Sequence, residues 1–271
     1  MDHDIKDGWF TAADLSQKLA ALGIAEGLVF DELPSTNTYA KEHANGCDKV
    51  PLVIVANGQT KGRGRFQRSF VSPQGTGIYL SLLIKPEESL QDISFLTIAA
   101  SLAVVDMIAM HYPLQPAIKW LNDVYVNHKK VCGILCEGVL DAGSNAYRSL
   151  VIGIGINTHT ATSDIPLELQ HSMTSLRMES GIAVPRLALI ETLLKQFFHY
   201  YQQIIAHDYS FMERYRSLNF LIGKTVVIDG HNDPYLVLGI NDCGHIILLD
   251  EQQKQLIKHA GEVSLRQKEI V

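Results

Sequence analysis

The chain has 271 residues, of which 46% are hydrophobic and 19% are charged, and its formal net charge is −6. This composition is typical of a globular protein with one large domain, or with one large and one small domain. The acidic charge argues against general binding to nucleic acid. We find no run of about 18 apolar residues of the kind that spans a membrane, and the acidic N-terminal stretch lacks the apolar segment of a signal peptide.

The cysteine and histidine patterns bear on the compartment and on metal chemistry. The four cysteines form no CxxC pair and the 11 histidines form no HExxH motif. We therefore expect buried free thiols, a reducing cytoplasm and no structural zinc. The cysteines are Cys47, Cys132, Cys136 and Cys243.

The first predicted element is a short helix from about Thr11 to Leu22, with Thr11 as its N-cap. Residues 1–27 are interpreted as a helical appendage that packs on the rest of the chain and is too short for a DNA-binding domain. A strand over 28–33 then leads into a helix capped within the Ser35-Thr36-Asn37 stretch. A continuous apolar run over 50–57 predicts a buried strand.

The middle of the chain predicts a strand over 77–84 that pairs with the preceding one, a long buried helix over 95–110, and a buried strand over 149–158. The segments AIKW, DVYVN and VCGILCEGVL are interpreted as three short strands, with Lys129 and Lys130 in the turn between the last two. The strands near 77–84 and 135–140 are candidates for pairing with an acceptor protein or a second copy, which leaves a homodimer open. An amphipathic helix is predicted from Pro185 to about His207, and a second helical stretch follows it to about Phe220.

The composition changes at Gly223, after which four short strands are separated by the turn sequences DGHNDP, NDCG and EQQK. Such a meander predicts a small barrel of SH3-like size. The expected division is therefore an N-terminal appendage over 1–27, a large mixed domain over 28–221 and a small β-barrel domain over 222–271.

The stretch from Gly58 to Phe70, GQTKGRGRFQRSF, contains four cations, interspersed glycines and no acid. Arginine forks bind phosphate or carboxylate in a bidentate manner, and glycines let a backbone lie against a ligand. A solvated surface loop or an RNA-binding segment would have a similar composition. This basic loop by itself therefore leaves both a binding role and a structural role open.

Two later stretches place polar groups at the ends of predicted strands. IKWLNDVYVNHKKVCGIL (118–135) contains an Asn-Asp pair and two lysines, and IGIGIN (152–157) ends on an amide. Each has a purely structural interpretation, since Asn and Asp commonly form turns. No P-loop sequence is present, and IGIGIN lacks the third glycine of a dinucleotide-binding fingerprint.

Taken together and in this order, the motifs resemble those of the biotin–protein ligases over roughly residues 28–268. The matching residues are Ser35-Thr36-Asn37, Gln59 with Gly62-Arg63-Gly64-Arg65 and Arg68, Lys119-Trp120-x-Asn122-Asp123, Lys130-x-x-Gly133-Ile134-Leu135, Gly153-x-Gly155-Ile156-Asn157 and Gly261-Glu262-x-Ser264-Leu265-Arg266. The resemblance implies an α+β fold. A mixed-sheet catalytic domain of the class II aminoacyl-tRNA synthetase-like type is packed with helices and followed by a small SH3-like barrel.

The resemblance also implies a two-step reaction. The biotin carboxylate attacks the α-phosphate of ATP to give biotinyl-5′-AMP and pyrophosphate, and a lysine of a biotin carboxyl carrier domain then takes the biotinyl group. Mg²⁺ would bridge the phosphates. Family members that act as repressors carry a winged helix-turn-helix that residues 1–27 cannot hold, so the resemblance is to the monofunctional type, with neither DNA nor membrane as a partner.

Roles for individual residues follow from the resemblance alone. Catalysis is assigned to Lys130, Arg63 and Arg65. Biotin binding is assigned to Ser35, Thr36, Asn37, Gln59, Arg63, Gly64, Arg65, Lys130 and Gly133. The ATP or adenylate side is assigned to Arg68, Asn122, Asp123, Asn157 and Arg266, with Asp123 left open as a metal ligand or an orienting group.

Three positions depart from the family pattern without removing a group that is expected to act chemically. Leu121 replaces the proline of KWPND, Phe70 replaces a tryptophan, and Ala260 replaces a glycine. A lipoate–protein ligase of related fold is the nearest rival interpretation, and the GRGRxxR loop favours biotin. A nucleic-acid-binding regulator is a second rival, and the acidic net charge counts against it.

Overall fold

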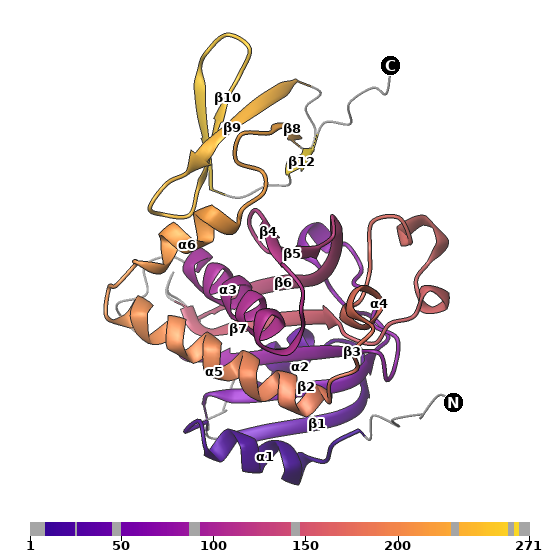
Figure 1. Ribbon diagram of the computed structural model, residues 1–271. Helices are drawn as coiled ribbons and strands as arrows, with labels where there is room; N and C mark the ends of the chain where they lie inside the picture. Colours follow the sequence, from indigo (N-terminus) through magenta and orange to yellow (C-terminus); the bar gives the residue numbers. More distant parts are fainter. Residues whose placement is uncertain are drawn as a thin grey trace.

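The computed structural model describes residues 9–24, 26–44, 50–86, 93–141, 147–228, 233–259 and 263–265. Two β-sheets organise this part of the chain (Figure 1). The larger has seven strands in the order β1-β2-β3-β7-β6-β5-β4, and the smaller has five in the order β11-β10-β9-β8-β12. The strands of the larger sheet are β1 (Glu26–Leu33), β2 (Leu52–Gln59), β3 (Gly77–Ile84), β4 (Ala117–Lys119), β5 (Asp123–Val126), β6 (Lys129–Leu140) and β7 (Tyr147–Asn157).

Helices lie on both faces of the larger sheet, and the smaller sheet follows them in the chain. The helices are α1 (Ala12–Ala20), α2 (Thr36–His43), α3 (Ser94–His111), α4 (Leu176–Ser180), α5 (Arg186–Ile205) and α6 (Phe211–Leu218), with short 3₁₀ turns η1 (Arg65–Gln67), η2 (Thr162–Asp164) and η3 (Leu167–Leu169). The strands of the smaller sheet are β8 (Thr225–Ile228), β9 (Pro234–Ile240), β10 (Ile246–Leu249), β11 (Gln255–Lys258) and β12 (Val263–Leu265).

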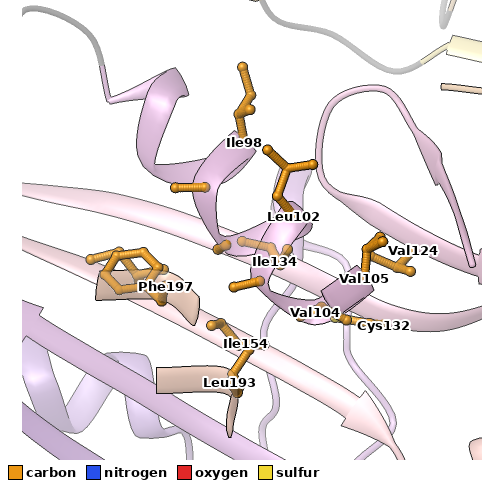
Figure 2. Close-up of a cluster of buried hydrophobic side chains, with 14 of the residues drawn as sticks. Ile98, Leu102, Val104, Val105, Val124, Cys132, Ile134, Ile154, Leu193 and Phe197 are labelled. Atoms are coloured by element: carbon orange, nitrogen blue, oxygen red, sulfur yellow. The ribbon is translucent and has the colours of Figure 1, made fainter. Parts of the chain in front are cut away.

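The main core lies between the larger sheet and the pair α3 and α5. Figure 2 shows Leu102 of α3, Ile134 of β6, Ile154 of β7 and Phe197 of α5 converging there, and all four are buried. On the opposite face of the sheet, α2 covers a smaller apolar cluster that includes Ala40. Because both faces are covered, β2 and β3 are buried along nearly their whole length, as their continuous apolar sequences predict.

Helix α3 is long and apolar enough to cross a membrane by length and composition, with a mean hydropathy of 1.7 over Ser94–His111. Within the protein, however, 78% of that stretch is buried. Its hydrophobicity is therefore accounted for by the core that it shares with α5 and the sheet.

The predicted N-terminal helix is present and packs on the larger sheet. Thr11 caps α1 through a reciprocal capping box with Asp14. Leu15 and Leu19 are buried, and they lie so close to Gly27 that a Cβ at that position would be 2.5 Å from Leu19 Cδ1. Gly27 is therefore a residue of β1 that lets the helix approach the sheet.

Two expectations about the strands are wrong. Lys129 and Lys130 do not lie in a turn, because β6 begins at Lys129 and the turn is formed by Asn127 and His128, both with positive φ. β3 is not an edge strand, since it pairs with β2 and β7. β6 pairs with β5 only between Lys129 and Gly133, and beyond that point its strand partner among the described residues is β7. The place of β3 inside the sheet rules out its pairing with another protein. Pairing through residues 135–140 of β6 remains a prediction.

The four predicted C-terminal strands are present as β8 to β11, and β12 adds a fifth that pairs with β8. The smaller sheet contacts the rest of the chain through specific hydrogen bonds: Trp120 Nε1 donates to Gly244 O at 2.8 Å, and Arg216 Nε donates to Ile240 O at 2.7 Å. The predicted boundary near residue 222 falls in the connection between α6 and β8. The division into three parts remains a prediction.

Candidate active site

A cavity open to solvent lies over the larger sheet, between the start of α2 and the basic loop. It brings together most of the residues singled out in the sequence. The predicted site residues that line it are Ser35, Thr36, Asn37, Gln59, Arg63, Gly64, Arg65, Arg68, Asn122, Asp123, Lys130 and Gly133. Segments far apart in the sequence thus contribute to one site.

One end of the cavity is formed by the N-terminus of α2. Ser35 is the N-cap, and its hydroxyl accepts a hydrogen bond from Thr38 N. Thr36 N donates to Gln59 Oε1 at 2.9 Å, which satisfies one of the N–H groups that every helix start leaves unpaired. Gln59 Nε2 in turn donates to Ser72 Oγ at 2.9 Å. Gln59 is thereby held with a defined amide orientation at the rim of β2.

Asn37 is a buried polar group at this end and is only 4% exposed. Its Nδ2 donates to Leu135 O at 3.2 Å and to Glu137 Oε2 at 2.9 Å. The Ser81 hydroxyl lies 2.6 Å from Asn37 Oδ1 and 2.8 Å from Thr36 Oγ1, so either oxygen accepts its proton. The Asn37 amide is therefore hydrogen-bonded at both ends, as a buried polar group requires.

The floor of the cavity is made of glycines. Gly133 of β6 and Gly155 of β7 are direct partners in the sheet. The Phe70 ring lies on them, because a Cβ at Gly155 would be 2.5 Å from Phe70 Cε1 and a Cβ at Gly133 would be 3.2 Å from Phe70 Cε2. With Trp120 and Ile134 also lining the cavity, the middle of the site is aromatic and apolar.

The other end of the cavity is cationic. Lys130 Nζ lies 2.8 Å from Asp123 Oδ1. Asn122 Nδ2 donates to the same carboxylate oxygen at 3.1 Å and to Ile134 O at 2.9 Å, and its Oδ1 accepts from Arg65 Nη1 at 3.1 Å. One amide thus connects a basic-loop arginine to the carboxylate that holds the lysine.

The backbone of Lys130 is held by the segment that follows η3. Lys130 N donates to Ser172 O at 2.9 Å, and Thr174 N donates to Lys130 O at 3.0 Å. These two bonds extend the sheet at the point where β6 begins, so the lysine projects from a hydrogen-bonded strand. A side chain on a strand is positioned more sharply than one in the turn that the sequence suggested.

The basic loop is partly ordered by its own backbone. Gly64 N donates to Arg68 O at 2.7 Å, and Phe70 N donates to Gly62 O at 2.9 Å. Between them, η1 includes Phe66, which has a φ of 54° and is 58% exposed. The loop is therefore a narrow hairpin-like flap with an exposed tip.

Two predicted site residues are not among those that line the cavity. Asn157 is buried at the end of β7, where its Nδ2 donates to Thr174 O at 3.1 Å and its Oδ1 has no hydrogen-bond partner among the described residues. Arg266 lies outside the described residues, so its predicted role remains a prediction.

Sequence reasoning missed three polar residues that support the site: Ser72, Ser81 and Glu137. Ser81 is fully buried within the apolar strand β3. A lone serine in such a strand is a usable signal, since a buried hydroxyl needs a partner. Ser72 and Glu137 had no comparable signal, because their partners come from distant parts of the chain.

Glu137 has a shifted pKa with identifiable causes. Burial by itself raises the pKa of this carboxyl. The hydrogen bonds from Lys41 and Asn37, together with the charges of Lys41 and Arg63, outweigh burial and hold the pKa below its ordinary value. Glu137 is therefore ionised at neutral pH.

The described part of the chain contains no group of three or more His, Cys, Asp or Glu side chains arranged to hold a metal ion. The site instead combines hydrogen-bonding groups, an aromatic middle and several cations. Such an arrangement suits an elongated small molecule with a polar head and an anionic end. The fold and the site together are typical of an enzyme that binds two anionic reactants next to each other.

Comparisons with known proteins identify the family. Residues 29–157 match the model of the biotin/lipoate A/B protein ligase family. The chain is 34% identical over 252 residues to the bifunctional ligase/repressor BirA of Bacillus spizizenii, covering 92% of this chain and 77% of that protein. It is 30% identical over 228 residues to the biotin–[acetyl-CoA-carboxylase] ligase of Mycobacterium tuberculosis, covering 81% of each.

The structural comparison agrees. The biotin protein ligase from Aquifex aeolicus in complex with biotin and ATP superimposes with a TM-score of 0.75 at 27% identity, covering 89% of this chain and 98% of that chain. This chain therefore belongs to the biotin/lipoate A/B protein ligase family. The expected α+β fold class and the resemblance to the biotin protein ligases are both confirmed.

Proposed function

We propose that the chain is an ATP-dependent biotin protein ligase. It activates biotin as biotinyl-5′-AMP and transfers the biotinyl group to a lysine of a biotin carboxyl carrier domain. The observation that supports this most directly is the polarity of the cavity. At one end Asn37 of α2 lies against Gly153, and at the other Lys130 lies against Gly133, which is two residues further along the β6–β7 ladder than the Gly153 partner Leu135. The bicyclic head of biotin would bind at the first end and its carboxylate at the second.

The head-binding end offers complementary hydrogen-bonding groups. Gln59 Oε1 accepts from Thr36, and one Nε2 proton is used by Ser72, which leaves the second Nε2 proton for a ligand carbonyl. Asn37 Oδ1 can accept from a ligand N–H. A cyclic urea presents both a carbonyl and N–H groups, so it fits this pair of amides.

The cationic end supplies the electrostatics of adenylation. Attack of a carboxylate on the α-phosphate of ATP brings two anions together, and the negative charge on the phosphoryl oxygens must be stabilised. Lys130 is assigned to the position between carboxylate and α-phosphate, with Arg63 and Arg65 beside it. Asp123 accepts from Lys130 and Asn122, which favours an orienting role for this carboxylate.

The adenylate side is assigned to Arg68, Asn122, Asp123, Asn157 and Arg266. Asn157 Oδ1 is a buried acceptor without a partner in the described residues. Such an atom is commonly satisfied by a ligand or a water, and an exocyclic amine of a base is a suitable donor.

Mg²⁺ is part of the proposal as a counter-ion for the ATP phosphates. Asp123 is the one carboxylate among the described residues that line the cavity. Because Mg²⁺ in nucleotide sites is held largely by phosphate oxygens and by one or two carboxylates, a site with few acids fits this ion. When bound, it would neutralise phosphate charge.

The acceptor in the second step is proposed to be a carrier domain of a biotin-dependent carboxylase, as the name of the Mycobacterium tuberculosis relative implies for that protein. The acceptor lysine amine attacks the carbonyl carbon of the adenylate, and AMP leaves with the bonding electron pair. A homodimer and a cytoplasmic location remain predictions from the sequence.

The experiment that tests the function uses the whole chain with ATP and Mg²⁺, adding biotin in one sample and lipoate in another. We expect biotin-dependent ATP–pyrophosphate exchange and a bound species with the mass of biotinyl-5′-AMP. Exchange driven by lipoate and not by biotin would replace the proposal with the rival lipoate–protein ligase. Exchange with neither acid would overturn both.

A further inference from the structure

Glu137 contacts two cavity-lining residues and a lysine of α2 from outside the cavity. Its Oε2 accepts from Asn37 Nδ2 at 2.9 Å, and its Oε1 accepts from Lys41 Nζ at 2.7 Å. Arg63 Nη2 lies 3.5 Å from the same Oε1. Glu137 is on β6, directly opposite Val151 of β7, and its side chain is 19% exposed. It is thus a partly buried carboxylate between α2 and the basic loop.

The contacts of Asn37 determine which end of its amide faces the cavity. The Leu135 carbonyl and the Glu137 carboxylate both lie at one end, and neither can donate a proton. That end must therefore be the NH₂ group, and both of its protons are used. The other end approaches Gly153, where a Cβ would lie 2.1 Å from Asn37 Oδ1.

The oxygen end of Asn37 retains capacity for a ligand. Ser81 has a single hydroxyl proton, which it offers to either Thr36 Oγ1 or Asn37 Oδ1. A carbonyl oxygen accepts two hydrogen bonds. Asn37, which lines the cavity, therefore presents an acceptor and no donor to whatever binds there.

We infer that Glu137 is a positioning residue that makes the head-binding end selective for ligands with an N–H donor. By keeping the Asn37 amide in one orientation, the carboxylate requires the ligand head to donate a hydrogen bond to Oδ1. A cyclic urea meets this requirement, whereas a dithiolane ring has no N–H and does not. This inference rests on the proposed function, since it concerns the selectivity of the same cavity.

The ion pair with Arg63 gives Glu137 a second contact with the site. Arg63 belongs to the basic loop, and its backbone forms an isolated antiparallel β-bridge with Ser69 across the flap. The same carboxylate thus contacts the polar head-binding end through Asn37 and the flap through Arg63. Replacing the carboxylate by an amide leaves its shape unchanged but adds a donor at the Asn37 end. The constraint on the Asn37 amide then rests on the longer bond to the Leu135 carbonyl, at 3.2 Å, and is weakened.

The test compares the unmodified protein, Glu137→Gln, and the control Asp141→Asn, which neutralises an exposed acid just beyond the end of the same strand. Calorimetry without ATP gives the Kd of biotin and of its two ring N-methylated derivatives. For each protein we take the ratio of the Kd of the more affected N-methyl derivative to the Kd of biotin. This ratio should be about ten or more for the unmodified protein and for Asp141→Asn. In Glu137→Gln this ratio should fall by about fivefold or more, because the stronger of the two acceptors that hold the Asn37 amide is lost and the amide can turn more readily.

The ratio within one variant does not depend on the fraction of folded protein, so partial unfolding of Glu137→Gln does not obscure the result. An unchanged ratio in Glu137→Gln, with biotin bound by all three proteins, overturns the inference and leaves the proposed function in place. A lack of biotin binding by the unmodified protein instead overturns the proposed function. Pyrophosphate exchange at saturating biotin should keep its kcat within about threefold in Glu137→Gln, since a positioning residue of the head-binding end acts on KM.

Discussion

Lys130 Nζ and Asp123 Oδ1 lie 2.8 Å apart, although the two residues are not opposite each other in the β5–β6 ladder. Asp123 pairs with Gly133, and Lys130 pairs with Tyr125 across a register shift between Val124 and Tyr125. The side chains meet over Gly133, where a Cβ would be 3.2 Å from both Lys130 Cε and Nζ. The irregular register and the glycine together place the ammonium group at the cationic end of the cavity.

Replacing Lys130 by alanine should reduce biotin adenylation by about a hundredfold or more, since a cation positioned at developing charge contributes on this scale. Steady-state ATP–pyrophosphate exchange measures the loss. Lys129→Ala changes the adjacent lysine, which does not belong to the cavity lining, and should retain near-normal exchange. A near-normal rate for Lys130→Ala would show that this lysine is not catalytic.

The flap formed by the basic loop should be cut rapidly by trypsin in the absence of ligands, because its tip is exposed and its cations repel one another. Biotin with ATP should slow cleavage between Gly62 and Arg68 by bringing carboxylate and phosphate to those cations. Peptide mapping by mass spectrometry follows the cuts. Cleavage at Lys254, in the exposed turn before β11, provides the internal control and should not change. Equal loop cleavage with and without ligands would make the flap an ordinary surface loop.

A methyl group on the cavity floor should displace the aromatic ring above it. In Gly155→Ala the new Cβ would lie 2.5 Å from Phe70, so we expect a loss of biotin affinity of about tenfold and a destabilisation of about 1–3 kcal/mol. Titration calorimetry and urea unfolding measure the two effects. Gly239→Ala, in a strand of the smaller sheet with no atom within 4 Å of the new Cβ, is the matched control. Similar behaviour of the two variants would contradict the described position of Phe70.

The lowered pKa of Glu137 predicts a pH-dependent contribution to stability. A carboxyl whose pKa is lower in the folded state than in the unfolded chain stabilises the folded state at pH values above the unfolded pKa, and this stabilisation is lost as pH falls through the lowered value. Glu137→Gln should therefore be less stable than the unmodified protein at pH 7, and the difference should shrink as the pH falls below the ordinary value of 4.5. Urea unfolding across this range tests the sign, and a difference that grows toward acid pH would contradict it.

Local signals in the sequence predicted most elements of the fold correctly. The apolar run before the basic loop is β2, Thr11 caps α1, and the four C-terminal strands lie where their turn sequences place them. These features depend on periodicity, capping and turn chemistry, which act over a few residues. The position of β3 inside the sheet was missed, because strand order depends on pairings between residues far apart in the chain.

The candidate site also combines features that the sequence determined with features that only the tertiary structure decided. The sequence by itself determined the chemical inventory: a glycine-interrupted arginine loop, a capped helix start, an Asn-Asp pair and Lys130, whose place on β6 only the structure showed. Only the tertiary structure decided that Asp123 contacts Lys130, that Asn122 connects them to Arg65, and that Glu137 sets the orientation of Asn37. The physical reason is that hydrogen bonds and ion pairs act over a few ångströms in space. Glu137 and Asn37 are 100 residues apart in the chain and become neighbours only when the sheet and α2 have assembled.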